Sequence, residues 1–159
     1  MIQRIQTIWL FIASITILSL FLFPYVQFFD VNGIAMALKI NGVLDSTGGQ
    51  NQLNTSFSFI LQTIATIVLG ILPLVTIFNY KNRKKQVNLI MFTIILTILF
   101  SFWLFITASN AVHAVGRAIT LSNIGIGALL VPLYIIFLLL AIKGIRKDNK
   151  LIKSAERLR

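Results

Sequence analysis

The sequence predicts an all-α membrane protein: a four-transmembrane-helix bundle with a short extracytoplasmic β-hairpin and a basic cytoplasmic C-terminal helix. Of the 159 residues, 57% are hydrophobic and only 11% are charged, which is the composition of a membrane protein. Four runs contain no Asp, Glu, Lys or Arg, and they cover residues 5–29, 46–80, 86–116 and 118–142. Each run supplies the ~20 mostly apolar residues that cross a bilayer core of about 30 Å. We therefore expect one membrane domain, residues 1–159, with spans at about 5–26, 56–80, 87–107 and 123–142.

The basic residues predict the orientation of these spans. With four spans, 12 of the 14 Lys and Arg residues lie on one side, namely Arg4, the cluster in residues 81–85 and the seven in residues 143–159. The other side holds only Lys39 and Arg117. Short loops rich in Lys and Arg stay in the cytoplasm, so both termini are expected there. The net charge of +10 then belongs to one membrane face, and we expect no nucleic-acid partner.

The first span is expected to stay in the protein rather than to be cleaved as a signal peptide. Arg4 followed by an apolar run resembles the start of a signal peptide, but the run is too long and no A-x-A-like cleavage site follows. The chain has no cysteine, which excludes disulfides and thiol chemistry.

The first outer loop, residues 27–55, begins with a hairpin signal. Residues 26–31 and 34–40 are β-prone, and the dipeptide Asn32-Gly33 between them suits a type I′ turn. This turn would place Val31 opposite Ile34 and Phe29 opposite Met36, with one apolar face. That face could form a lid over the bundle or dock a partner. Residues 45–51 are polar and glycine-rich and are expected to be flexible.

The second and third spans are expected to be antiparallel neighbours, because only residues 81–86 join them. Each carries small or polar residues at every fourth position, which lets helices approach closely and hydrogen-bond. We expect the two stripes to face each other inside the bundle; a substrate path and a contact with another subunit are the alternatives. The stripes are Gln62, Thr66 and Gly70 in the second span, and Thr93, Thr97 and Ser101 in the third.

The remaining segments flank the last two spans. Residues 108–118 could extend the third span as a helix, and residues 120–123 offer N-caps for the fourth. Residues 143–159 are expected to form a basic amphipathic helix, either continuing the fourth span or lying on the membrane surface. Its charges would contact anionic lipid headgroups or an acidic partner, and they are Lys143, Arg146, Lys147, Lys150, Lys153, Arg157 and Arg159.

The sequence contains few residues that could support ion transport, metal binding or catalysis. No ionisable residue lies inside a predicted span, which argues against a pump or an ion-coupled transporter. His113 is the only histidine and has no carboxylate near it in the sequence, so a metal site is not expected. We predict no catalytic residues and no cofactor.

Both ends of the chain resemble the domain-of-unknown-function 4293 family. Residues 1–7 (MIQRIQT) are similar to its opening, and residues 145–148 and 152–159 are similar to its basic ending, where Glu156 replaces a frequent Asp. The resemblance covers the whole length and implies a small inner-membrane protein of bacteria, mainly Bacteroidetes, without implying an activity.

These observations favour a non-enzymatic accessory or assembly subunit of a bacterial inner-membrane complex. A small oligomeric transporter or channel is the alternative, and a membrane enzyme comes third. The expected partners are membrane lipids, with anionic headgroups at the cytoplasmic face, and other membrane subunits or further copies of the chain.

Overall fold

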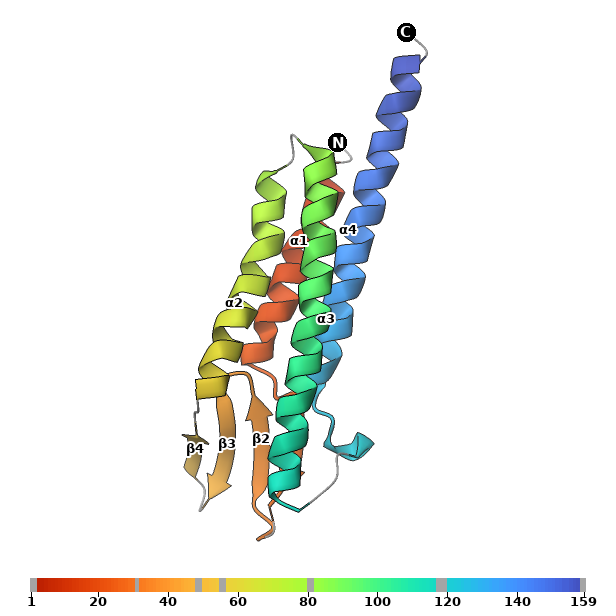
Figure 1. Ribbon diagram of the computed structural model, residues 1–159. Helices are drawn as coiled ribbons and strands as arrows, with labels where there is room; N and C mark the ends of the chain where they lie inside the picture. The colour runs from red at the N-terminus through yellow and green to blue at the C-terminus, as the bar shows by residue number, and fades with distance from the viewer. Residues whose placement is uncertain are drawn as a thin grey trace.

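The computed structural model describes residues 3–30, 32–47, 50–54, 57–79, 82–116 and 120–157. Within these residues, four α-helices and a β-sheet form the fold (Figure 1). In chain order the elements are α1 (Gln3–Leu18), the 3-10 turn η1 (Ser19–Phe21), β1 (Val26–Phe29), β2 (Ala35–Lys39), β3 (Gly42–Thr47), β4 (Gln50–Asn54), α2 (Phe57–Phe78), α3 (Arg83–Ala114), the 3-10 turn η2 (Leu121–Asn123) and α4 (Ile126–Arg157).

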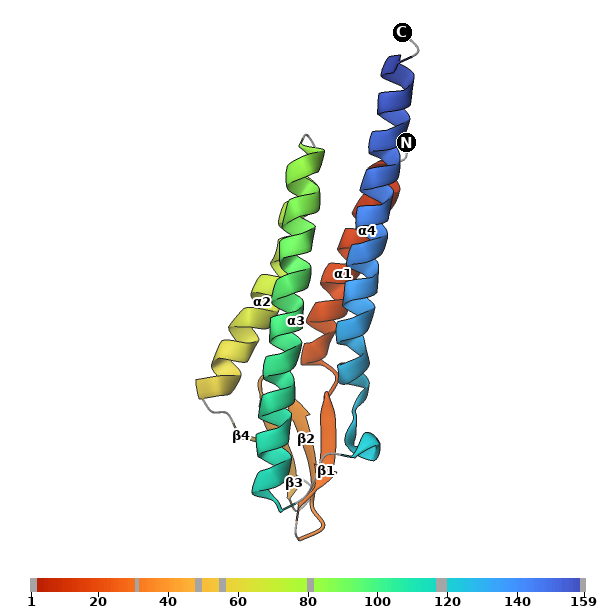
Figure 2. The same ribbon diagram turned by 45° about the vertical axis from the view of Figure 1, so that its right-hand side comes forward.

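The four helices lie side by side, and the sheet sits at one end of them (Figures 1 and 2). Both chain ends and the start of α3 lie at the opposite end, beyond which the C-terminal part of α4 projects. We call these the sheet end and the terminal end. The basic start of α3 and the basic part of α4 therefore share the terminal end, as the predicted topology requires.

Three helices are long and apolar enough to cross a membrane: α2, α3 and the part of α4 up to Asn149. The fourth apolar helix, α1, is shorter, and it packs mainly against α4 and α2. Large apolar side chains such as Phe102 and Leu129 remain 64% and 65% exposed. Such a surface is unfavourable in water and suits lipid, which confirms a helical membrane protein.

The first and third helices end at residues other than those predicted for their spans. The first helix ends well before residue 26, because the chain turns at Pro24 and enters β1 at Val26. Helix α3 continues past residue 107 to Ala114, as the Ala-rich sequence indicated, and Gly116 follows with a positive φ of 70°.

Helix α4 begins at Ile126, so the predicted N-caps in residues 120–123 lie too early and belong partly to η2. The α1–β1 connection caps the helix instead: the Gly127 amide donates to the Pro24 carbonyl at 2.9 Å, and the Gly125 amide donates to the Tyr25 carbonyl at 3.0 Å. Glycine is required at position 125, since a Cβ atom there would lie 2.3 Å from the Pro24 oxygen.

The first hairpin is present, but its turn and register differ from the prediction. Asp30 donates its amide to Ile34 at 2.8 Å and accepts from Gly33 at 3.0 Å, so three residues form the loop. Gly33 has φ of 77°, whereas Asn32 is not among the positive-φ residues, which excludes the type I′ turn that needs both. The pattern is a three-residue loop with glycine in the left-handed position.

The observed register pairs Phe29 with Ala35 and Phe28 with Met36, one position away from the expected pairing. A shift of one residue exchanges the two faces of a strand. The observed register places Val26 and Phe28 with Leu38 on the buried side and leaves Gln27 exposed, whereas the predicted register would have placed Gln27 opposite Leu38.

A second hairpin follows the first, where the sequence suggested a flexible tip. Strands β3 and β4 pair from Val43↔Asn54 to Thr47↔Gln50, and the sheet order is β1-β2-β3-β4. Residues 45–47 and 50–51 are therefore strand residues, while Gly48 and Gly49 lie outside the described residues. The polar residues in these strands adopt β-structure because β3 pairs with β2 and β4 pairs with β3, which extends the ladder.

Candidate functional site

The first candidate site is a groove at the sheet end, between β1, β2 and the η2 region. Its volume is about 770 Å³. Phe28, Met36 and Leu44 contribute apolar surface, while Thr120 and Asn123 add polar groups. Phe29 also lines it and is 56% exposed. Strand β1 forms one edge of the sheet, and a single bridge between Val26 and Ile124 covers the start of that edge.

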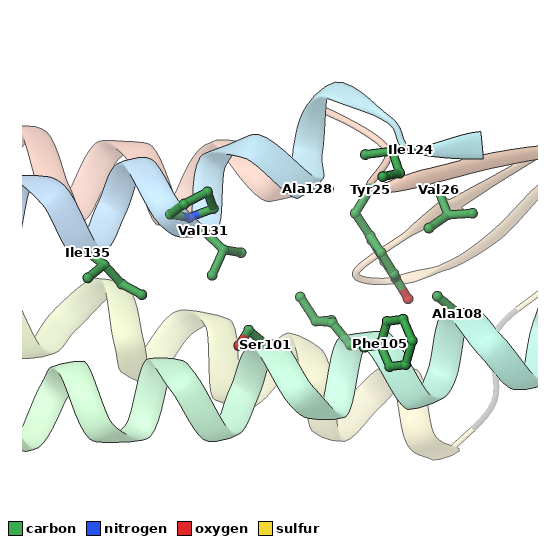
Figure 3. Close-up of a pocket in the computed structure, with 11 residues that line it drawn as sticks. Tyr25, Val26, Ser101, Phe105, Ala108, Ile124, Ala128, Val131 and Ile135 are labelled. Carbon is green, nitrogen blue, oxygen red and sulfur yellow. The ribbon is translucent and has the colours of Figure 1, made fainter. Parts of the chain in front are cut away.

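The second candidate site is an apolar cavity of about 350 Å³ between α3 and α4 (Figure 3). Leu104 and Phe105 line it from α3, while Ala128, Val131 and Ile135 line it from α4. Tyr25 closes it at the sheet end. Because its walls are almost entirely hydrocarbon, the cavity suits a lipophilic guest rather than water.

Tyr25 brings the main polar group to this cavity. Its side chain is 3% exposed, and its hydroxyl has no hydrogen-bond partner among the described residues. Burial raises the pKa of this phenol, so the group stays a neutral donor at physiological pH. Tyr134 is equally buried, but its hydroxyl donates to the Leu69 carbonyl at 2.8 Å. Of these two buried tyrosines, only Tyr25 therefore has a hydroxyl without a partner among the described residues.

The predicted polar stripes lie mostly inside the bundle. Gln62, Thr66, Gly70, Thr93 and Thr97 are buried, while Ser101 is half-buried. Gln62 donates to the Thr107 hydroxyl at 2.7 Å and so links α2 to α3. Thr66, Thr93 and Thr97 instead donate to the carbonyl four residues earlier in their own helices.

Gly70 departs from the expected pairing of the two stripes, because it lies against α1. Its carbonyl accepts a hydrogen bond from the Ser14 hydroxyl at 2.6 Å, and an added Cβ would lie 2.7 Å from the Leu18 side chain. The stripe in α2 therefore serves two neighbours: Gln62 faces α3 and Gly70 faces α1. The energetic role of these residues in packing stays a prediction.

A buried polar pair near the terminal end joins α1 to α4. The sequence did not predict this contact. Gln6 donates its side-chain amide to Asp148, and the two residues are 7% and 5% exposed. The second carboxylate oxygen has no partner among the described residues. Gly144, one helical turn before Asp148, leaves room for the Gln6 side chain. Asp148 stands out in the sequence as an acidic residue within a basic segment. It does not indicate Gln6 as its partner, because the two residues are 142 positions apart.

The predicted contact residues of the basic segment lie on α4. Lys143, Arg146 and Lys147 are exposed. Lys150, Lys153 and Arg157 continue the same helix, and Arg159 lies outside the described residues. The described part of the chain contains no group of three or more His, Asp or Glu residues that could hold a metal ion. His113 is exposed at the sheet end of α3.

A family model with the description Domain of unknown function (DUF4293) matches residues 2–158. No curated protein and no solved structure is detectably similar to the chain.

Proposed function

This chain belongs to the DUF4293 family, and we propose that it is a non-enzymatic accessory or assembly subunit of a bacterial inner-membrane complex. The groove beside β1 is the observation that carries the proposal. It combines an apolar floor, a largely open strand edge and the half-exposed ring of Phe29. Surfaces with these properties bind protein segments, either as an added strand or through a buried aromatic anchor.

The proposed topology has four membrane crossings with both termini in the cytoplasm. Helix α1 and η1 together measure about 30 Å along their axis, which is enough to cross a bilayer core without tilt. An even number of crossings agrees with chain ends that share one end of the bundle. The positive-inside rule assigns the terminal end, with its basic residues, to the cytoplasm.

Reporter fusions test this topology. A reporter that is active only in the cytoplasm should be active after Arg159 and inactive when inserted between Thr47 and Gln50. Activity at the second position, or silence at the first, would contradict four crossings with cytoplasmic termini.

Native purification tests the proposed role. The tagged full-length protein, extracted in mild detergent, should co-purify with a second membrane protein in a fixed ratio. Phe29→Ser should reduce that recovery several-fold, because an aromatic anchor in such a groove contributes about 2 kcal/mol or more. His113→Ser is the matched control, since His113 is exposed at the same end but does not line the groove. Recovery of a pure homo-oligomer would support a small transporter or channel instead.

A further inference from the structure

We propose that the cavity between α3 and α4 binds one acyl chain of a phospholipid from the leaflet at the sheet end, with the lipid ester carbonyl accepting a hydrogen bond from Tyr25. This inference concerns a site other than the groove beside β1. It does not depend on the accessory role.

The shape of the cavity fits a chain rather than a compact polar ligand. Its volume of about 350 Å³ lies at the lower end of the range for small-molecule sites. Its lining residues on α4 run from Ala128 to Ile135, which corresponds to about 10 Å of helix axis. The walls along this length are apolar side chains apart from Ser101, whose hydroxyl already donates to the Ile98 carbonyl at 2.7 Å.

The polar end of the cavity lies where a phospholipid carries its ester groups. Figure 3 shows the phenol of Tyr25 reaching across the sheet end of the cavity, with its hydroxyl beside Phe105 and Ala108. The polar residues Ser122 and Asn123 come directly before Ile124, close to where a headgroup would lie. From this end the cavity runs toward the middle of the membrane helices, in the direction that an acyl chain takes.

The Tyr25 hydroxyl supplies the specific contact. A buried donor without an acceptor is unfavourable, so an occupant that brings an acceptor is favoured. A neutral phenol donates to an ester carbonyl, and an alkane chain fills the remaining apolar space. A chain that arrives from lipid gains only the difference in packing, because the lipid interior is as apolar as the cavity.

Photocrosslinking in nanodiscs tests this proposal with the full-length protein. The probe is a phosphatidylglycerol whose acyl chain carries a diazirine, and mass spectrometry maps the labelled peptides. We expect labelling to concentrate on the cavity residues of α3 and α4, such as Leu104 and Val131. Ala128→Phe should reduce cavity labelling at least 5-fold by filling the space. Leu129→Phe is the matched control, because Leu129 lies on the same helix, is exposed and does not line the cavity.

Tyr25→Phe provides a second variant that removes a single oxygen atom and should fold. Cavity labelling should fall about 3- to 10-fold, the factor that one ordinary hydrogen bond contributes. Its melting temperature in lipid-free detergent should stay unchanged or rise, because the variant removes an unpaired buried donor. Equal labelling of the cavity in Ala128→Phe and Leu129→Phe, or in Tyr25→Phe and the wild type, would overturn the proposal. Native mass spectrometry that finds a bound lipophilic molecule other than a phospholipid would overturn the assigned occupant.

Discussion

At the residue scale, the structure explains why particular glycines stand where they do. Gly33 adopts a positive φ of 77° in the first hairpin loop, and Gly125 allows α4 to begin against the Pro24 carbonyl. The first requirement concerns the backbone conformation and the second concerns space. The two can be separated by substitution, because asparagine tolerates the left-handed conformation whereas no side chain fits at position 125.

Gly33→Val should destabilise the protein by about 1–2 kcal/mol, since a β-branched residue at positive φ is strained. No atom lies within 4 Å of a Cβ at this position, so steric crowding does not contribute. Thermal unfolding in detergent measures the effect. Gly33→Asn is the control and should cost clearly less. Equal melting temperatures for the valine and asparagine variants would contradict the assigned loop conformation.

At the element scale, the helices and the contact between α2 and α3 were predictable, whereas the packing of α1 was not. Long uncharged runs specify membrane helices because lipid excludes unpaired backbone groups. The period of four in α2 indicated a buried side, but it did not reveal that Gly70 meets α1 while Gln62 meets α3. The second hairpin escaped prediction because residues 45–54 are almost all polar or glycine, a composition typical of loops. The cavity beside Tyr25 depends on how two helices diverge, for which the sequence contains no pattern.

Gly70→Leu should weaken the contact between α1 and α2. The new side chain would start from a Cβ only 2.7 Å from the Leu18 side chain, so Leu18 must change its position or the helices must separate. Overpacking of this kind costs about 1–3 kcal/mol. Adding Leu18→Ala should recover part of the loss by making room, as measured by thermal unfolding. If Leu18→Ala adds its own cost without any recovery, the close approach of these two residues is not what limits the substitution.

The Gln6–Asp148 pair should couple α1 to the end of α4. Gln6→Ala leaves a buried carboxylate without its donor and should cost about 1–3 kcal/mol. Asp148→Asn keeps the size and an acceptor oxygen and should cost less. In a double-mutant cycle with Asp148→Ala, the combined loss should be smaller than the sum of the single losses. Strict additivity of the unfolding free energies would show that the pair does not interact.

At the scale of the whole molecule, the two ends of the bundle have opposite characters. The sheet end offers a groove and a cavity with few charges, whereas the terminal end gathers most of the basic residues. Helix α4 connects the two, because its 32 residues measure about 48 Å and exceed a bilayer core of about 30 Å. The basic segment is therefore a continuation of α4, one of the two arrangements that the sequence left open.

This continuation predicts a graded electrostatic contact with anionic lipid. Attraction to an anionic leaflet is worth about 1 kcal/mol per basic residue and falls off within a Debye length of about 8–10 Å. Along an upright helix, Lys147 lies about 6 Å beyond Lys143, whereas Arg157 lies about 21 Å beyond it. The residues nearest the membrane should therefore account for most of the attraction.

Two matched double variants test this gradient in nanodiscs of anionic and zwitterionic lipid. Arg146→Gln with Lys147→Gln should remove about 2 kcal/mol of the stabilisation that anionic lipid provides. Lys153→Gln with Arg157→Gln removes the same charge farther out and should have a much smaller effect. High salt should abolish the difference between the two lipid compositions in the wild type, because the charges nearest the membrane, on Lys143, Arg146 and Lys147, are exposed to solvent. Equal losses in both variants would mean that the segment bends down and lies along the headgroups. Losses in neither would assign these charges to a protein partner, and crosslinking from Ser154 would then identify it.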